Sequence, residues 1–279
     1  MKKISRRSFL AAAGLTVAAL ALTACGGSAS TASSAASSVA ASSEAASTSA
    51  AAAELTTVEA GKLTMATNAT FPPYEMTTDA GTIEGIDVET AQAIADKLGL
   101  ELQIDDMDFD AALLSVQQGK ADIVMAGVTV TDERKNVMDF SDSYATGIQS
   151  IIVPEGSDIA SPDDLAGKKI GTQRGTTGYI YCSDDFGDDA VVAYDSGLTA
   201  VQALNNGQVD AVVIDNAPAK EFVAANPGLV ILDTSYAEED YAIGMAKGSS
   251  LEDAVNAVLE ELKADGTLQS IVDKYITAE

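Results

Sequence analysis

The chain of 279 residues carries 16 lysines and arginines against 42 aspartates and glutamates, a net charge of −26 at pH 7. A surface this acidic repels nucleic acid and anionic lipid, which are therefore disfavoured as partners. The sequence contains no histidine. Its absence removes the commonest general base, the commonest metal ligand and every His-dependent catalytic triad.

The N-terminus begins with a cationic region made up of Lys2, Lys3, Arg6 and Arg7. The apolar run that follows, from about 9 to 22, is too short and too rich in alanine for a membrane span. It ends in Leu22-Thr23-Ala24-Cys25, which resembles a bacterial lipobox, in which the cysteine is acylated and becomes the first mature residue. We therefore expect a signal peptide over 1–24, lipidation at Cys25, and a protein anchored on the extracytoplasmic face of the cell membrane. The alternative is an ordinary signal peptide with an incidental cysteine, and the export route (general secretory or twin-arginine) stays open.

Residues 25–54 are almost entirely serine, alanine, threonine and glycine. Such a segment has too little apolar bulk to order itself, although its alanines could form transient helix. We expect a lipid-anchored tether that spans on the order of 30 Å as a flexible coil. The folded domain is expected to begin at about Leu55.

Strands and helices alternate along the rest of the chain, which is typical of an α/β fold. A strand is expected over 63–66, then a helix with apolar positions Val88, Ala91, Ala95 and Leu98. Gly99 would stop that helix, and a strand over 100–104 follows. Later strands are expected near 169–171, 191–194 and 230–232. A helix should start at Ser161, and Ser250 should cap a further helix.

Two similar stretches, 116–125 and 204–213, occur one in each half of the domain. In each, an amphipathic helix ends near a glycine and an apolar run follows that is short enough for a buried parallel strand. Open parallel sheets bind ligands at the carboxyl ends of their strands, which here are Gly127 and Asp215. Segments 149–153 and 241–245 could cross between two lobes. We expect lobe 1 over 55–147 and 236–279, with 148–235 inserted as lobe 2.

Neither a metal nor a disulfide is expected in the folded domain. The stretch 106–110 faintly resembles a calcium loop, but Ala111 and Gln117 replace the glycine and the closing glutamate that such a loop needs. If Cys25 is acylated, Cys182 is a lone thiol, best interpreted as a small buried apolar side chain. No cofactor is expected.

The arginines are scarce and specifically placed. Of the four in the chain, two belong to the expected signal peptide, and the others, Arg134 and Arg174, fall within 126–134 and 171–178. A guanidinium is a planar, permanently charged fork that can bind a carboxylate through two hydrogen bonds. Because both stretches lie beside expected helix starts, the pattern indicates capture of a small ligand that carries an anionic group.

Six motifs follow one another in order across the domain: Thr67-Asn68-Ala69-Thr70-Phe71-Pro72-Pro73-Tyr74-Glu75, Gly85-Ile86-Asp87-Val88-Glu89, Met107-Asp108-Phe109, Ala126-Gly127-Val128-Thr129-Val130-Thr131-Asp132-Glu133-Arg134, Gly175-Thr176-Thr177-Gly178 and Val213-Ile214-Asp215. With them, the region 58–275 resembles the extracellular amino-acid-binding proteins of polar amino-acid ABC importers (bacterial solute-binding protein family 3). The resemblance implies a two-lobed, type II periplasmic-binding-protein-like α/β fold. Each lobe would be a mostly parallel sheet flanked by helices, and two crossover segments would form the hinge.

The resemblance also implies a function and a site. A monomeric, non-enzymatic protein would capture a free amino acid by hinge closure and deliver it to the ABC permease subunits. Arg134 would bind the ligand α-carboxylate with Thr129 and the N–H groups of Gly127 and Thr177. Asp215 would accept from the α-ammonium, with the Gly127 carbonyl nearby. The remaining expected ligand-binding residues are a pair that sandwiches the apolar stem and a pair at positions that bear on specificity: Phe71, Phe109, Asn68 and Gln173.

The ligand and some roles stay open at this point. Asn68 stands where several relatives have an acid, so a polar neutral or an acidic amino acid is favoured over a cationic one. From the residues alone, Arg134 could be a surface arginine, Asp215 a turn residue, and Phe71 and Phe109 core residues. An extracytoplasmic, dehydratase-like enzyme and a signalling receptor are alternatives on the same fold. Substrate turnover would identify the first. Only the identity of the partner separates the second from an importer, and a neighbouring permease gene would decide between them.

Overall fold

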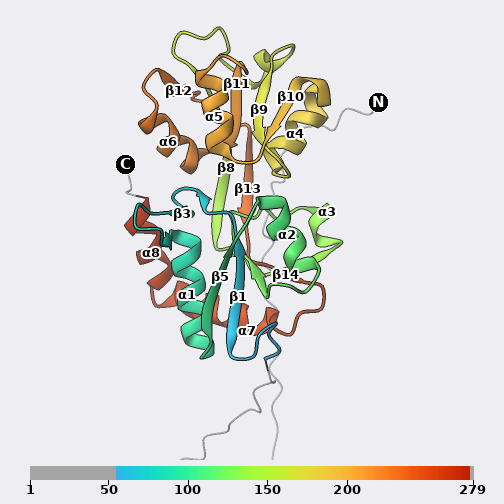
Figure 1. Ribbon diagram of the computed structural model, residues 1–279, viewed down its shortest axis with the longest axis vertical. Coiled ribbons are helices and arrows are strands. Elements are labelled where there is room, and N and C mark those ends of the chain that lie inside the picture. The colour runs from blue at the N-terminus through green and yellow to red at the C-terminus, as the bar shows by residue number, and fades with distance from the viewer. Residues whose placement is uncertain (1–54, 277–279) are drawn as a thin grey trace, which may run out of the picture. The chain divides into compact units, whose positions relative to one another are not determined.

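The computed structural model describes residues 55–276, so the expected signal peptide, tether and lipidation site at Cys25 lie outside the described residues. Two main sheets organise this part of the chain (Figure 1). The first has the order β5-β1-β6-β14-β7, formed by Glu101–Asp106, Lys62–Thr67, Ile123–Val124, Gly244–Ala246 and Met138–Phe140. The second has the order β10-β9-β11-β8-β12, formed by Val191–Tyr194, Ile170–Gln173, Ala211–Asp215, Ala145–Pro154 and Leu229–Ile231.

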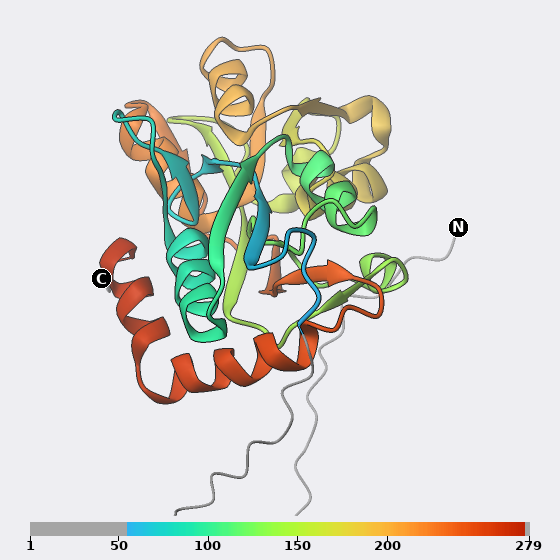
Figure 2. The same ribbon diagram turned by 60° about the horizontal axis from the view of Figure 1, so that its bottom comes forward.

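We call the first sheet and the elements around it lobe 1. These elements are a small sheet of β2 (Thr70–Phe71), β3 (Glu75–Thr77) and β4 (Ile83–Glu84), and the helices α1 (Ile86–Leu98), α2 (Phe109–Gln117), α3 (Asp132–Lys135), α7 (Glu252–Ala264) and α8 (Thr267–Tyr275). Lobe 2 is the second sheet with α4 (Thr177–Phe186), α5 (Gly197–Asn205), α6 (Asn216–Ala225) and the 3-10 turns η1 (Pro162–Leu165) and η2 (Asp188–Ala190). In Figure 2, α7 and α8, drawn in red, run along one edge of lobe 1, and both contact α1.

Two strands join the lobes. β8 leaves lobe 1 and β13 (Ala237–Tyr241) returns to it, and the two pair antiparallel from Ala145↔Tyr241 to Gln149↔Ala237. Figure 1 shows them side by side between the two sheets. The return strand ends at the residue where the expected crossing segment, 241–245, begins. Its acidic sequence did not indicate a strand, and it forms one by pairing with β8.

The repeated unit has the expected structure in both lobes. After α2 and after α5 the chain passes through Gly119 and Gly207, both left-handed at φ 65° and 66°. The apolar runs that follow form β6, parallel to β1, and β11, parallel to β9. The carboxyl ends of these strands are therefore placed at the inner edges of the two lobes, where the site is built.

Two helix starts differ from the expectation. At Ser161 only the four-residue 3-10 turn η1 forms, and the serine hydroxyl donates to the Asp164 carboxylate, not capping a backbone N–H. α7 begins after Leu251, and the Ser250 hydroxyl accepts from the Thr56 N–H at 3.4 Å. Cys182 is buried, as expected. None of the helices within 55–276 is both long and apolar enough to cross a membrane.

Candidate ligand-binding site

A cavity lies between the lobes, at the carboxyl ends of β6 and β11. Its empty space, which includes open solvent at its mouth, is about 440 Å³. All nine ligand-binding residues expected from the sequence line it. Glu75, Gln149 and Tyr241, to which the sequence assigned no role, line it as well.

Arg134 enters the cavity from lobe 1. It lies in α3, whose first turn is capped by the Thr131 hydroxyl accepting from the Arg134 N–H at 3.2 Å. Its side chain is held by two backbone carbonyls, Thr129 at 2.7 Å and Gly175 at 3.1 Å, and lies 5.5 Å above the Phe109 ring. The residue is only 8% exposed and makes no ion pair within the described part of the chain. Burial lowers its pKa, yet an arginine stays charged, so the cavity contains a positive charge.

Thr177 brings a helix N-terminus to the same cavity. It is the first residue of α4, whose N-cap, Thr176, accepts from the Tyr179 N–H at 3.3 Å. The N–H groups of a first helical turn have no partner within the helix and favour an anion. The Thr177 hydroxyl lies 3.4 Å from the Thr129 hydroxyl of lobe 1, which donates to Glu239 at 3.1 Å. The first-turn N–H groups of α4 and the two threonine hydroxyls thus lie near the guanidinium of Arg134, although the Thr129 hydroxyl proton is used by Glu239.

Gly127 lines the cavity as expected, but its N–H group, expected to bind the ligand carboxylate, donates to another residue. Its N–H donates to the Asp87 carboxylate at 3.0 Å, so in this structure it does not point a free N–H at a ligand carboxylate. Its φ is +56°, and a Cβ at this position would lie 2.8 Å from Cε1 of Phe71. A glycine is therefore needed for the chain to turn close to that ring.

Asp215 supplies a buried acid from lobe 2. It ends β11 and caps α6, accepting from the Ala217 N–H at 3.0 Å and from the Ile148 N–H at 2.7 Å. Burial raises its pKa to about 6, although these hydrogen bonds oppose the rise. A carboxylate has about four acceptor positions, so the capping role leaves capacity for an ammonium donor. The turn role and the binding role considered for this residue are compatible.

Aromatic side chains form the apolar walls. Phe71 and Phe109 are 9% and 5% exposed and both line the cavity. Phe71 stacks on Tyr74 at 5.8 Å between ring centroids, and Tyr74 packs edge-on against Tyr241. The stem of a ligand would therefore meet rings on the lobe 1 side.

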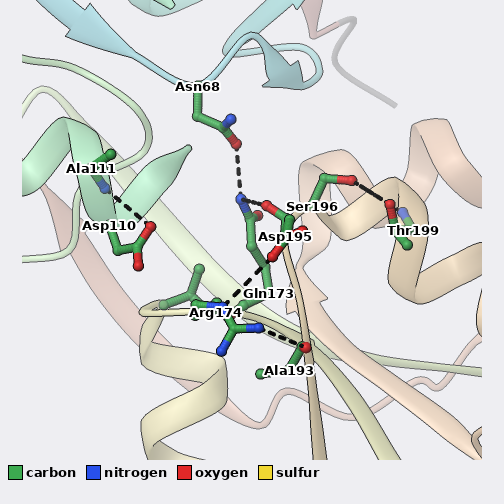
Figure 3. A network of polar contacts seen from close by, with 10 residues as sticks. Asn68, Asp110, Ala111, Gln173, Arg174, Ala193, Asp195, Ser196 and Thr199 are labelled. Atoms are coloured by element: carbon green, nitrogen blue, oxygen red, sulfur yellow. Dashed lines mark hydrogen bonds and ion pairs between the residues drawn. The ribbon is translucent and has the colours of Figure 1, made fainter. Parts of the chain in front are cut away.

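The lobes touch directly at the other end of the cavity. Figure 3 shows Asn68 of lobe 1 reaching Gln173 of lobe 2, whose amide donates to the Asn68 oxygen at 2.8 Å. The Asn68 amide in turn donates to the Met107 carbonyl. With the Arg134–Gly175 and Thr129–Thr177 contacts, this places the two lobes in a closed arrangement. Arg174 instead lies outside the cavity lining and reaches Asp195 and the Ala193 carbonyl on lobe 2.

Glu75 is a carboxyl group that the inference about the ligand, drawn from the sequence, did not include. A cationic ligand was disfavoured because Asn68 replaces an acid and no other carboxylate was apparent. The structure places Glu75 in the cavity wall, fully buried, and neither carboxylate oxygen accepts from an N–H or hydroxyl donor among residues 55–276. The residue belongs to a motif quoted above. The sequence did not show which way the Glu75 side chain points, because Glu75 is the first residue of the three-residue strand β3, which is too short to show an alternation of buried and exposed positions.

The chain is similar to proteins that bind amino acids. Residues 63–278 match the family model for bacterial extracellular solute-binding proteins, family 3. The L-cystine-binding protein TcyJ of Escherichia coli is 33% identical, covering 79% of this chain and 85% of its own length. The arginine-binding extracellular protein ArtP of Bacillus subtilis is also 33% identical, covering 78% and 87%.

A solved structure gives the same result. The solved structure of an ancestral arginine-binding protein bound to arginine is 42% identical in sequence; the match covers 77% of this chain and 98% of that chain, with a TM-score of 0.74. The expected two-lobed fold of type II periplasmic binding proteins is confirmed. On the family model, the relatives and the fold together, the chain belongs to the bacterial extracellular solute-binding proteins, family 3.

Proposed function

We propose that this protein is the substrate-binding component of an ABC importer for an amino acid. It captures the free solute between its lobes and presents the closed form to the permease subunits, without making or breaking a bond. The observation that carries the proposal is one buried cavity with the guanidinium of Arg134, which makes no ion pair within residues 55–276, on lobe 1 and the carboxylate of Asp215 on lobe 2. A zwitterion complements both, in surroundings that exclude water and strengthen each contact.

The ligand that this cavity favours has a side chain that donates hydrogen bonds and carries positive charge. Glu75 offers two carboxylate oxygens that accept from no N–H or hydroxyl donor within 55–276, and a buried acceptor left without a donor is costly. A guanidinium or an ammonium would satisfy it, whereas an acidic side chain would be repelled. ArtP and the ancestral protein bind arginine, which supports a basic amino acid as the ligand here.

A thermal-shift comparison of L-arginine with agmatine tests this function. L-Arginine is expected to raise the melting temperature, because a ligand that binds only the folded state adds about 2.7 kcal/mol at 100 times its Kd. Agmatine has the same guanidinium but no α-carboxylate for Arg134, so it should give little shift. If none of the common amino acids raises the melting temperature, amino-acid capture is the wrong function.

We further propose that Cys25 is lipidated and holds the protein on the outer face of the cell membrane. The lipobox-like sequence before it supports this, together with the low-complexity segment 25–54. Cys25→Ser should shift the protein from the membrane fraction to the soluble fraction, as measured by fractionation and immunoblotting. Cys182→Ser is the matched control, since that thiol is buried in the folded domain. A Cys25→Ser protein that still sediments with membranes would contradict the anchor.

A further inference from the structure

Two carboxyl groups lie together at the wall of the cavity, because the Asp87 N–H donates at 2.9 Å to the carbonyl of Tyr74, the residue before Glu75. Glu75 opens β3 and Asp87 lies in the first turn of α1, and both are 0% exposed. Glu75 lines the cavity, while Asp87 lies behind it and connects to the cavity through Gly127. The site therefore contains an acidic pair in addition to the charges that would bind the ligand backbone.

The hydrogen bonds around this pair are incomplete. One Asp87 oxygen accepts from the Gly127 N–H at 3.0 Å and from the Tyr144 O–H at 2.8 Å. The other Asp87 oxygen and both oxygens of Glu75 accept from no N–H or hydroxyl donor among residues 55–276, and neither carboxyl forms an ion pair there. The remaining hydrogen bond open to Glu75 is one with the Asp87 carboxyl itself. If both carboxyls were ionised, two negative charges would be buried side by side with no positive charge paired to either, which costs a large amount of free energy.

The surrounding groups do not supply the missing positive charge. The titratable groups that interact with the pair are Tyr74, Tyr144 and Asp106, none of them cationic. Tyr241, Asp215 and Arg134 line the same cavity as Glu75, and Arg134 forms no ion pair with either carboxyl within 55–276. Burial, followed by the charge of Asp87, raises the pKa of Glu75 well above its usual range. Burial also raises the pKa of Asp87 to about 6, with the Gly127 and Tyr144 hydrogen bonds opposing the rise. A proton held by Glu75 removes one of the two charges.

We propose that Glu75 and Asp87 share one proton in the ligand-free site, and that the cationic end of the ligand side chain displaces it. This rests on the proposed function and adds a proton-linked specificity device to it. The Glu75 carboxylic acid loses its proton to the solvent, and the resulting carboxylate pairs with the guanidinium or ammonium, which keeps its own charge. A neutral ligand of the same shape binds the protonated acid and releases no proton.

Calorimetry with L-arginine and L-citrulline at pH 7.5, in buffers of different ionisation enthalpy, tests the exchange. At this pH Asp87 and Asp215 are ionised, because the pKa of each is about 6. L-Arginine should release close to one proton, and its affinity should rise by up to about ten-fold per pH unit from pH 6.5 to 7.5. L-Citrulline, whose side chain is a neutral isostere, should release none. Arginine binding without proton release overturns the proposal.

The variant Glu75→Gln tests whether the proton released on arginine binding comes from Glu75. The variant should bind L-arginine without releasing a proton and with little dependence on pH, while its binding of L-citrulline shows that the site is still folded. Glu84→Gln, on the neighbouring strand and exposed, is the matched control and should behave as wild type. Proton release that persists in Glu75→Gln also overturns the proposal. Binding of neutral amino acids but not of arginine or lysine refutes this inference alone, whereas binding of no amino acid refutes the proposed function.

Discussion

Arg134→Ala is expected to reduce amino-acid affinity by roughly 30- to 4,000-fold. The ligand carboxylate would lose its only buried cationic partner among the lining residues, a loss worth about 2–5 kcal/mol. The guanidinium also holds the Gly175 carbonyl across the cleft at 3.1 Å, so its removal weakens closure as well. Isothermal titration calorimetry with L-arginine measures the effect directly.

Arg174→Ala is the matched control for that measurement. Its side chain is 53% exposed, faces Asp195 on the surface of lobe 2, and does not line the cavity. Affinity should therefore stay within about two-fold of wild type, since exposed ion pairs contribute little. Arg134→Lys should recover only part of the binding, because an ammonium keeps the charge but not the planar fork. Near wild-type affinity in Arg134→Ala would refute the assigned carboxylate site.

Asp215→Asn should weaken binding by a similar amount and also destabilise the fold. The amide removes the charge opposite the ligand ammonium, a loss of about 2–5 kcal/mol for a buried pair. Its NH₂ group would also face one of two backbone N–H groups, Ile148 or Ala217, that now donate to the carboxylate. We expect a further loss of about 1 kcal/mol in unfolding free energy from the impaired helix cap. Calorimetry and thermal melting measure the two effects separately.

The control for Asp215 is Asp210→Asn, which lies just before the same strand at an exposed position and accepts from the Lys169 N–H. It should leave affinity unchanged. In the wild type, the pKa of Asp215, raised to about 6 by burial, gives a second expectation. The carboxylate form pairs with the ammonium, so the affinity for a neutral ligand such as L-citrulline is full above pH 6 and falls as pH drops below it. An Asp215→Asn protein that binds as tightly as wild type would exclude this residue from the site.

Local patterns in the sequence predicted much of the fold. The helix that ends at Gly99, the strand Val191–Tyr194 and the repeated helix–glycine–strand unit all follow from periodicity and from glycines that take a left-handed conformation. Elements that depend on distant partners were not predictable in this way. β13 is acidic along most of its length, and it becomes a strand because β8 lies beside it.

The candidate site likewise has residues that the sequence predicted and residues that it did not. The resemblance to a family predicted nine residues that the structure brings together, because short motifs fix strand ends and helix starts. It did not predict Glu75, Gln149 or Tyr241, whose direction depends on a three-residue strand and on the two crossing strands. It also did not predict that Asp87 takes the Gly127 N–H, a contact between residues forty positions apart. Residue identity was readable from the sequence, but side-chain direction was not.

The insertion of lobe 2 into lobe 1 has a mechanical consequence. The folded chain begins and ends in lobe 1, where the Val58 N–H is fastened to Asp122 and Lys274 to Glu89. Any pulling force transmitted from the segment before Leu55 therefore loads lobe 1 alone. Lobe 2 is connected to lobe 1 through β8 and β13 and lies outside the path of that force. A tether attached before Leu55, whatever its length, would therefore not oppose a movement of lobe 2 relative to lobe 1.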